Sequence, residues 1–138
     1  MASRPVSFRL DDAVVEGLDR LSRTRGLTRN ALAERLLSEG TKMSEHPGIV
    51  FRDGALGRRA ALVGTRLDVW QVIGVLRDNA NDIDAAARWL DLPPAGVRAA
   101  IGYYAANRGE IDDVGARERE AAEWARGRWL AEQSVLSE

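Results

Sequence analysis

The chain has 138 residues, of which 45% are hydrophobic, and its formal net charge is −1 at pH 7. This composition indicates a folded protein of one or two small domains and excludes a chain that is disordered throughout. Because the sequence contains no Cys, it has no disulfide framework and no thiolate metal site, and we expect neither a metal nor another cofactor. No apolar run approaches the ~20 residues of a membrane span, so we expect a cytoplasmic protein with no membrane partner.

The first patterned stretch of the chain lies at residues 4–10. Apolar side chains occupy every second position, so an extended strand here would have one apolar side and one polar side. No further strand candidate occurs before residue 49, and a single unpaired strand is not stable. We therefore predict that the strand pairs with its counterpart in a second copy, in a two-stranded antiparallel ribbon. The side chains expected in the dimer core are Val6, Phe8 and Leu10.

Two helices are predicted after this strand. The first covers about residues 12–24, begins at an acidic pair that can cap it, and ends at Gly26, which suits a left-handed C-cap. The second covers about residues 28–40 and ends at Gly40. Its expected buried residues are Ala31, Leu32, Ala33, Leu36 and Leu37. A unit of ~40 residues buries too little surface to be stable as a monomer, which again favours a dimer.

The start of the second helix has a possible binding role. Thr28 can cap the helix, and its unpaired N–H groups carry the positive end of the helix dipole. Such a helix start can bind a DNA phosphate, with Arg29 and Asn30 nearby. Because a two-stranded ribbon also fits the DNA major groove, the phosphate contact and the ribbon support one another.

Residues 4–40 resemble the ribbon-helix-helix family of small dimeric DNA-binding proteins of the Arc, MetJ and CopG type. The resemblance is carried by the alternating strand, the acidic helix start and the glycine turn at residues 25–30, all at the family's spacing. It implies that Pro5, Ser7 and Arg9 face the groove. Pro5 is a departure because it has no side-chain donor, so base reading falls to Ser7 and Arg9, helped by Arg4 from the N-terminal arm.

A second unit is predicted to follow a linker at residues 43–48. Short strand candidates at residues 49–51 and 60–63 surround a glycine-containing turn, which is typical of a β-hairpin. Arg58 and Arg59, near Arg66, could bind an anion or nucleic acid, but we expect them to lie in solvent at the end of this hairpin.

Three helical segments come next, and their apolar stripes can enclose one small core. Asp68 and Asp82 are expected to cap the first two, and Pro94 is expected to start the third. The stripes consist of Val69, Val72, Ile73 and Leu76, then Ile83, Ala86, Ala87 and Leu90, then Val97, Ile101 and Tyr104.

The third of these helices carries small residues on its other side. They recur at helical spacing and are Ala95, Ala99, Gly102 and Ala106. A helix that is apolar on both faces is normally buried on both. Either the C-terminal helix of the same chain covers this face or the face binds a partner, and the sequence leaves both alternatives open.

The C-terminal segment, about residues 113–135, is predicted to be helical. Trp124 and Trp129 lie within one broad arc of it, and Arg128 stands beside them. Trp and Arg are the usual hot-spot residues of protein interfaces. We therefore predict a partner-binding surface centred on Ala99, Gly102, Trp124, Arg128 and Trp129.

Residues 46–110 resemble a small bacterial antitoxin-type domain found in VapB-like partners of PIN-type toxins. The matching pieces are His46-Pro47-Gly48-Ile49, Gly57-Arg58-Arg59, Gly64-Thr65-Arg66 with Val69-Trp70, and Val97 to Tyr104. The resemblance implies a helix-turn-helix-like core and pairing with a toxin encoded next door. It supplies no catalytic residues.

The best candidates for catalytic or metal-binding carboxylates are Asp82 with Asp84 and Asp112 with Asp113. Both pairs fall at predicted helix starts, where acidic side chains complement the helix dipole. No Gly-rich phosphate loop, Ser/His/Asp set or metal-ligand cluster occurs. The sequence therefore does not indicate an enzyme.

These observations predict a mainly α protein in four parts. The parts are a ribbon-helix-helix domain at residues 1–42, the linker at 43–48, a hairpin plus three-helix, helix-turn-helix-like domain at 49–110, and a C-terminal helix at 111–138. We predict a homodimer that binds double-stranded operator DNA, neutralises a PIN-type toxin and represses its own operon. Two alternatives stay open: a stand-alone regulator without a toxin, and a protein–protein adaptor whose ribbon only dimerises.

Overall fold

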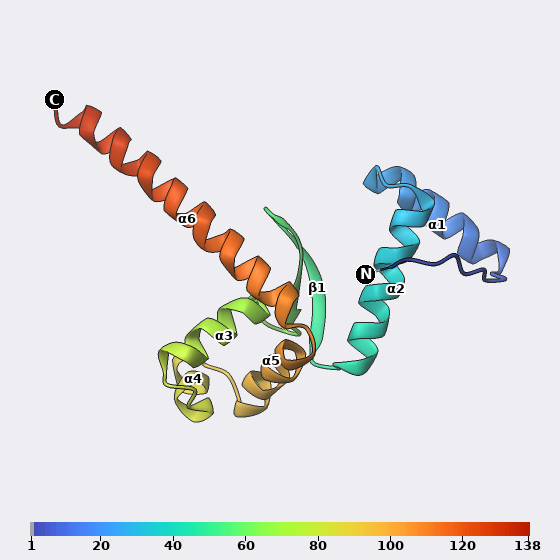
Figure 1. Ribbon diagram of the computed structural model, residues 1–138, viewed down its shortest axis with the longest axis horizontal. Helices are drawn as coiled ribbons and strands as arrows, with labels where there is room; N and C mark the ends of the chain where they lie inside the picture. The colour runs from blue at the N-terminus through green and yellow to red at the C-terminus, as the bar shows by residue number, and fades with distance from the viewer. Residues whose placement is uncertain (1) are drawn as a thin grey trace. The chain divides into compact units, whose positions relative to one another are not determined.

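The computed structural model describes residues 2–138, which divide into a first compact unit ending at Thr41 and a second from Lys42 to Glu138. Within the described residues there are six helices and one two-stranded sheet (Figure 1). The predicted mainly α fold is confirmed.

The first unit contains α1 (Asp12–Arg25) and the greater part of α2 (Arg29–Glu45). Gly26 ends α1 with φ 64°, and its N–H donates back to helix carbonyls, so the predicted left-handed cap is confirmed. The predicted acidic side-chain cap is wrong. The backbone carbonyl of Asp11, not its side chain, accepts from the N–H groups of Val14 and Val15, at 3.0 and 3.1 Å.

The second helix does not end at Gly40 as predicted, but continues to Glu45. A glycine inside a helix costs about 1 kcal/mol relative to Ala but does not by itself force an end. Pro47 supplies the stop, because a proline disfavours helical geometry in the residue before it. Residues 43–45, predicted as linker, are therefore helical, and three residues separate α2 from the first strand.

Residues 4–10 precede α1 without pairing to any strand of the described chain. Their apolar side chains are exposed, with 63% of Val6, 65% of Phe8 and 47% of Leu10 accessible to solvent. In the single chain, α2 buries only Leu32 of the five apolar residues predicted for it, and Leu36 and Leu37 are exposed. The predicted buried face of α2 is therefore wrong for one copy, because the hydrophobic surface of this unit stays uncovered.

The second unit opens with a hairpin of β1 (Ile49–Gly54) and β2 (Gly57–Leu62). The strands are antiparallel, in a register that runs from Ile49 opposite Leu62 to Gly54 opposite Gly57. Gly57 adopts φ 118° directly after the two-residue turn, a conformation that L side chains rarely adopt. The predicted hairpin is confirmed.

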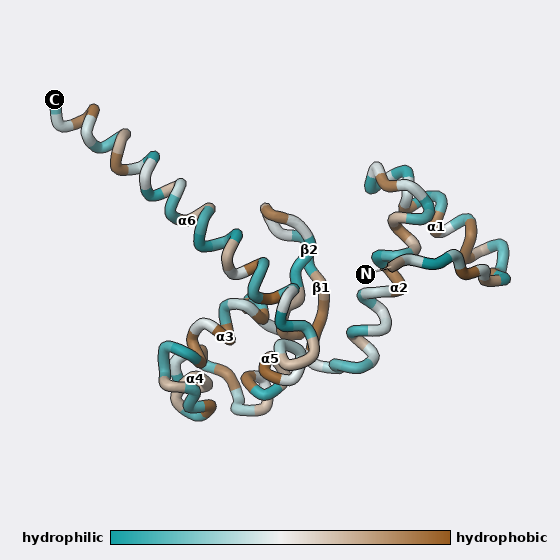
Figure 2. The backbone as a smooth tube through the Cα atoms, viewed as in Figure 1, coloured by the Kyte–Doolittle hydropathy of each residue, from teal (hydrophilic) through white to brown (hydrophobic). Residues whose placement is uncertain are grey.

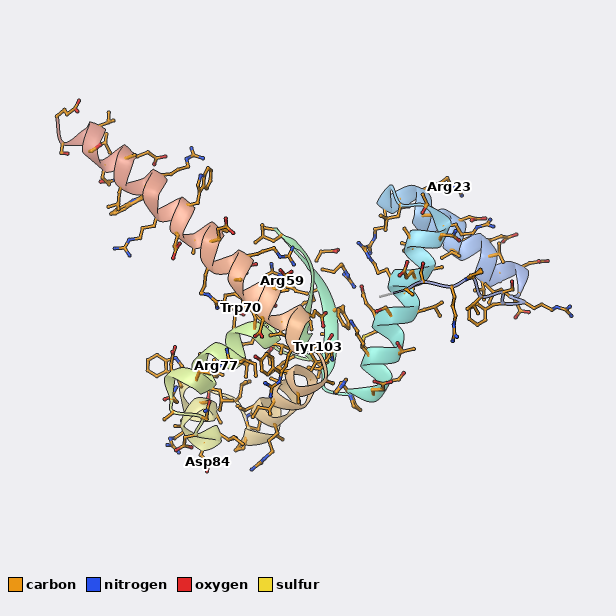
Figure 3. The ribbon with its side chains drawn as sticks, in the orientation of Figure 1. Arg23, Arg59, Trp70, Arg77, Asp84 and Tyr103 are labelled. Atoms are coloured by element: carbon orange, nitrogen blue, oxygen red, sulfur yellow. The ribbon has the colours of Figure 1, made fainter. Side chains whose placement is uncertain are left out.

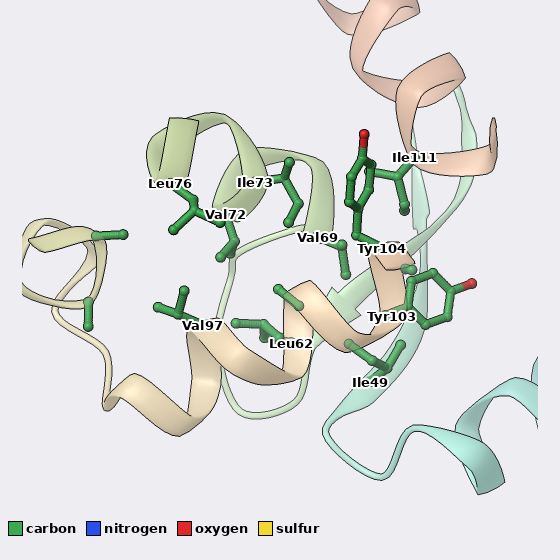
Figure 4. Packing of buried hydrophobic residues seen from close by; sticks show 14 residues of the cluster. Ile49, Leu62, Val69, Val72, Ile73, Leu76, Val97, Tyr103, Tyr104 and Ile111 are labelled. Carbon is green, nitrogen blue, oxygen red and sulfur yellow. The ribbon is translucent and has the colours of Figure 1, made fainter. Parts of the chain in front are cut away.

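Three helices follow and enclose the core: α3 (Val69–Asp78), α4 (Ile83–Leu90) and α5 (Pro94–Ala106). The four residues of the predicted α3 stripe are all buried (Figure 4). The Asp82 carboxylate caps α4 by accepting from the Ala85 N–H at 3.0 Å. The buried side of α5 differs from the prediction, because Ala100 and Tyr103 are buried while Ile101 is half-buried.

A three-residue turn joins α4 to α5, and its first residue, Asp91, is left-handed with φ 54°. The two helices pack against each other and against α3. This arrangement is helix-turn-helix-like, as predicted.

The last helix, α6 (Arg108–Leu136), starts five residues earlier than predicted. Asp112 and Asp113 therefore lie inside it and not at its start. Asp112 instead accepts a hydrogen bond from the Tyr104 hydroxyl at 2.7 Å, which ties α6 to α5. The buried residues of α6 are confined to its first part: Ile111, Val114 and Gly115.

From residue 122 onward every residue of α6 is exposed. Figure 1 shows this part of the helix running away from α3, α4, α5 and the hairpin, and Figure 2 shows hydrophobic residues recurring along it. We call residues 122–136 the C-terminal extension. Among the described residues, no helix is long and apolar enough to span a bilayer.

Candidate DNA-binding interface and partner surface

The predicted groove-facing residues lie on the extended segment before α1. Arg4, Pro5, Ser7 and Arg9 are all exposed. The apolar residues that alternate with them are exposed as well, so in a single chain neither side of this segment is covered. The structure thus leaves residues 4–10 accessible on both sides and unpaired with any strand of residues 2–138.

The start of α2 has the cap that the sequence predicts. The Thr28 hydroxyl oxygen accepts from the Ala31 N–H at 3.1 Å, and Thr28, Arg29 and Asn30 are all exposed. The helix start is accessible, and its dipole favours an anion there. Its geometry is compatible with the predicted phosphate contact.

Arg29 has a partner that sequence reasoning missed. Its guanidinium donates from Nε and Nη2 to the two carboxylate oxygens of Asp19 on α1, each at 2.8 Å. The hydrogen bond from Arg29 is the main reason that the pKa of Asp19 lies below its ordinary value, and the same bond raises the pKa of Arg29. This pair is ten residues apart and joins two helices, so no single-helix spacing rule could reveal it. A phosphate at this helix start would have to share Arg29 with Asp19.

The small-residue side of α5 is open. Gly102 and Ala106 are exposed, and a Cβ built at Gly102 would meet no atom within 4 Å. Ala99 is half-buried because Gly48 packs closely against it. A Cβ added at Gly48 would lie only 3.0 Å from the Cβ of Ala99. The alternative in which α6 covers this face is therefore wrong.

The C-terminal extension carries the two predicted aromatic anchors. Trp124 is 65% exposed and Trp129 56% exposed. The Arg128 guanidinium lies 5.0 Å from the centre of the Trp124 ring, a cation–π distance. Neither Trp covers the small face of α5, so the structure does not bring the two halves of the predicted partner surface together in one chain.

Arg59 is the clearest disagreement with the sequence interpretation. It was expected in solvent, yet its side chain is only 14% exposed and donates to Asp68 at 2.8 Å and to Glu118 of α6. Figure 3 shows Arg59 and Trp70 where the hairpin, α3 and α6 meet. The period of two in β2 places Arg59 on the same side as buried Ala61, a signal that the sequence did carry.

The described residues hold no cluster of three or more His, Cys, Asp or Glu that could bind a metal ion. Asp82 and Asp84, once candidates for metal or acid–base chemistry, lie at the N-cap and in the first turn of α4.

An exposed alternating segment followed by two helices joined at a left-handed glycine is the arrangement expected of a ribbon-helix-helix domain, a class of DNA-binding transcription regulators. Residues 4–40 match the family described as ribbon-helix-helix protein, copG family, and residues 49–104 match DUF433, described as a protein of unknown function. The chain therefore combines a CopG-type ribbon-helix-helix domain, which belongs to a family of DNA-binding regulators, with a DUF433 domain. Comparison with curated proteins and with solved structures gives no significant match.

Proposed function

We propose that the protein is a homodimeric, sequence-specific DNA-binding antitoxin. It neutralises a PIN-type toxin by direct binding and represses the operon that encodes both. The observation that carries the DNA-binding part is the exposure of Val6, Phe8 and Leu10 on a segment whose other side is polar.

Dimerisation through residues 4–10 answers two needs of the first unit. It pairs the backbone N–H and C=O groups of the strand, and it covers apolar side chains that the single chain leaves in water. Leu36 and Leu37 of α2 are exposed in the same unit and add to the surface that a second copy would bury. Antiparallel pairing leaves Ser7 and Arg9 of both copies on the opposite side, where they face the major groove.

The toxin-binding part of the proposal depends on the second unit. The C-terminal extension is 15 residues of helix with no intrachain cover, two large aromatic side chains and a glycine at position 127. These residues continue a helix whose first part is packed, but they have no tertiary packing of their own, and the glycine lowers their helix propensity. A partner that covers Trp124 and Trp129 would stabilise the extension, and the resemblance of residues 46–110 to VapB-like antitoxins suggests a PIN-type toxin as that partner.

Truncation tests this assignment. Because Val114 and Gly115 are buried, the cut belongs after Ala121, which removes only exposed residues. The protein lacking residues 122–138 should keep its melting temperature and its operator binding but lose the toxin. The measurements are co-expression with the product of the neighbouring gene, rescue of growth, and co-purification.

A matched control changes one surface at a time. Leu130 is exposed about 100° around the helix from Trp129 and about 120° from Trp124, outside the arc that the two Trp residues share. Leu130→Ala should therefore preserve toxin binding while Trp129→Ala weakens it. Toxin neutralisation by the truncated protein would move the partner site elsewhere, and the hairpin at residues 49–66 is the next candidate.

One observation favours an alternative function. Asp19 occupies Arg29, the residue expected to hold a phosphate, and this favours an adaptor whose ribbon dimerises without tight DNA binding. The adaptor and the antitoxin differ in one measurement, the affinity for the promoter upstream of the gene. A stand-alone regulator would bind that promoter and would have no toxin gene beside it.

A further inference from the structure

A largely buried ionic group of the second unit lies near the base of the C-terminal extension. Arg59 of β2 donates from Nη1 to Asp68 Oδ2 at 2.8 Å and from Nη2 to Glu118 Oε1. The Trp70 indole N–H donates to the same Asp68 oxygen at 3.2 Å. The carboxyl-bearing side chains are 11% and 22% exposed, so one guanidinium links the hairpin, the start of α3 and α6 in a site largely closed to water.

Because these charged side chains are buried, their hydrogen-bond geometry is tightly constrained. Burial opposes the charge on Arg59, but the hydrogen bonds and charges of the two carboxylates outweigh that effect and raise the pKa of Arg59 above its ordinary value. A buried ion pair adds little net stability compared with apolar packing, yet breaking it leaves an uncompensated charge. The planar guanidinium also donates in fixed directions. A rotation or slide of α6 would therefore break the Glu118 bond.

The position of Glu118 along α6 determines how strongly this contact affects the direction of the C-terminal extension. The buried apolar residues of α6, Ile111 and Val114, lie closer to the start of the helix, and from residue 122 the helix is fully exposed. Leu136 is 18 residues beyond Glu118, about 27 Å at 1.5 Å per residue. A tilt of about 10° at Glu118 would then move the tip of the helix by about 5 Å.

We propose that Arg59 is a positioning residue that fixes the direction of the C-terminal extension relative to the hairpin and the three-helix core. Apolar contacts at Ile111 and Val114 and the Tyr104–Asp112 hydrogen bond hold the first turns of α6 against the core. The Arg59 bridge adds a directional contact further along the helix, at Glu118. The extension is thereby presented in a fixed orientation before any partner arrives. Its value for toxin binding rests on the proposed function, but the orientation itself does not.

The absence of Cys makes the test direct, because two introduced cysteines can be spin-labelled without background. Ser134→Cys on the extension and Asp84→Cys on α4 are exposed positions within the second unit. Labelled full-length protein is mixed with excess unlabelled protein, so that each dimer carries one labelled chain. Electron paramagnetic resonance then measures the distribution of distances between the two labels.

The decisive comparison is Glu118→Gln against Glu120→Gln. Both remove one negative charge from α6, but Glu120 is exposed and Glu118 holds Arg59. We expect Glu118→Gln to widen the distance distribution roughly twofold, since the helix loses its distal anchor, and Glu120→Gln to leave it unchanged. An equally narrow distribution in both variants would overturn the proposal.

Two further measurements separate the possible causes. Thermal melting checks that Glu118→Gln is folded. If it is not, Arg59→Lys replaces it, because Lys keeps the positive charge but lacks the planar fork that bridges two carboxylates. This variant should widen the distance distribution in the same way. A narrow distribution in a folded Arg59→Lys also rejects the positioning role. Failure to find a toxin counts against the proposed function alone, because the distances are measured without one.

Discussion

The Phe8→Asp substitution tests whether the ribbon is a dimer interface. Fully burying a Phe side chain stabilises by about 1.5–3 kcal/mol. Since Phe8 is 65% exposed in one chain, roughly two-thirds of that, about 1–2 kcal/mol per copy, remains to be gained when a second copy covers it. The aspartate forfeits this gain and also places a carboxylate at an apolar contact, which costs several kcal/mol per ion or forces protonation.

Summed over two copies, the loss is at least about 5 kcal/mol, which corresponds to a more than thousandfold weaker dimer at about 1.4 kcal/mol per factor of ten. Sedimentation equilibrium over a range of concentrations would measure the dissociation constant directly. Far-UV circular dichroism would report whether α1 and α2 unfold when the dimer is lost, as the small size of this unit predicts.

Ser7→Asp is the matched control, because it adds the same charge one position away on the polar side of the strand. It should leave the dimer intact and weaken DNA binding through repulsion from phosphates. The reasoning would be refuted if Phe8→Asp dimerised as tightly as Ser7→Asp, or if the unaltered protein were a folded monomer at micromolar concentration.

Two further predictions concern the same unit. Arg9→Ala should remove about 1–3 kcal/mol of sequence discrimination per half-site, measured as the ratio of operator to random-sequence affinity. Arg29→Ala should instead weaken binding to all DNA sequences and reduce the salt dependence of binding. If Arg9→Ala kept the affinity ratio of the unaltered protein, the ribbon would not be the element that recognises the DNA sequence. The carboxylate of Asp19 should titrate below the ordinary Asp value of 3.8, and Arg29→Ala should return its pKa toward that value in an NMR pH titration. Because the folded-state pKa is lowered, the contribution of this pair to stability is present above the ordinary pKa and is lost as pH falls through the lowered one. An Asp19 titration that Arg29→Ala leaves unchanged would contradict the ion pair.

Local patterns in the sequence were sufficient where a single element decides the outcome. The α3 stripe is predictable because four apolar residues at helical spacing must face one core, and Val69 to Leu76 do so. The end of α1 is predictable because few residues other than glycine adopt the left-handed conformation that Gly26 shows. In both cases the cause lies within a few residues of the effect.

The errors arise where the cause lies elsewhere in the chain. The sequence predicts a helix end at Gly40, although the stop comes from Pro47 several residues later. The sequence pattern predicts Arg59 in solvent because its two carboxylate partners, Asp68 and Glu118, are 9 and 59 residues away. No propensity reports such a pairing, because it depends on how α6 crosses the hairpin. The exposed apolar residues of the first unit are another error of this kind, because the surface expected to cover them lies on a second chain.

The exposed C-terminal extension acquires a further consequence once the chain is a dimer, because every dimer then carries two extensions. A partner with a single binding site would engage each extension independently. A partner that is itself a dimer would bind the second extension at an effective concentration set by the spacing of the two sites, which for flexible tethers is in the millimolar range. Such bivalent binding can exceed the affinity of one extension by about 10² to 10⁴ without any additional contact. The number of extensions bound by each partner molecule would then determine how steeply complex formation depends on the concentration ratio of this protein to its partner.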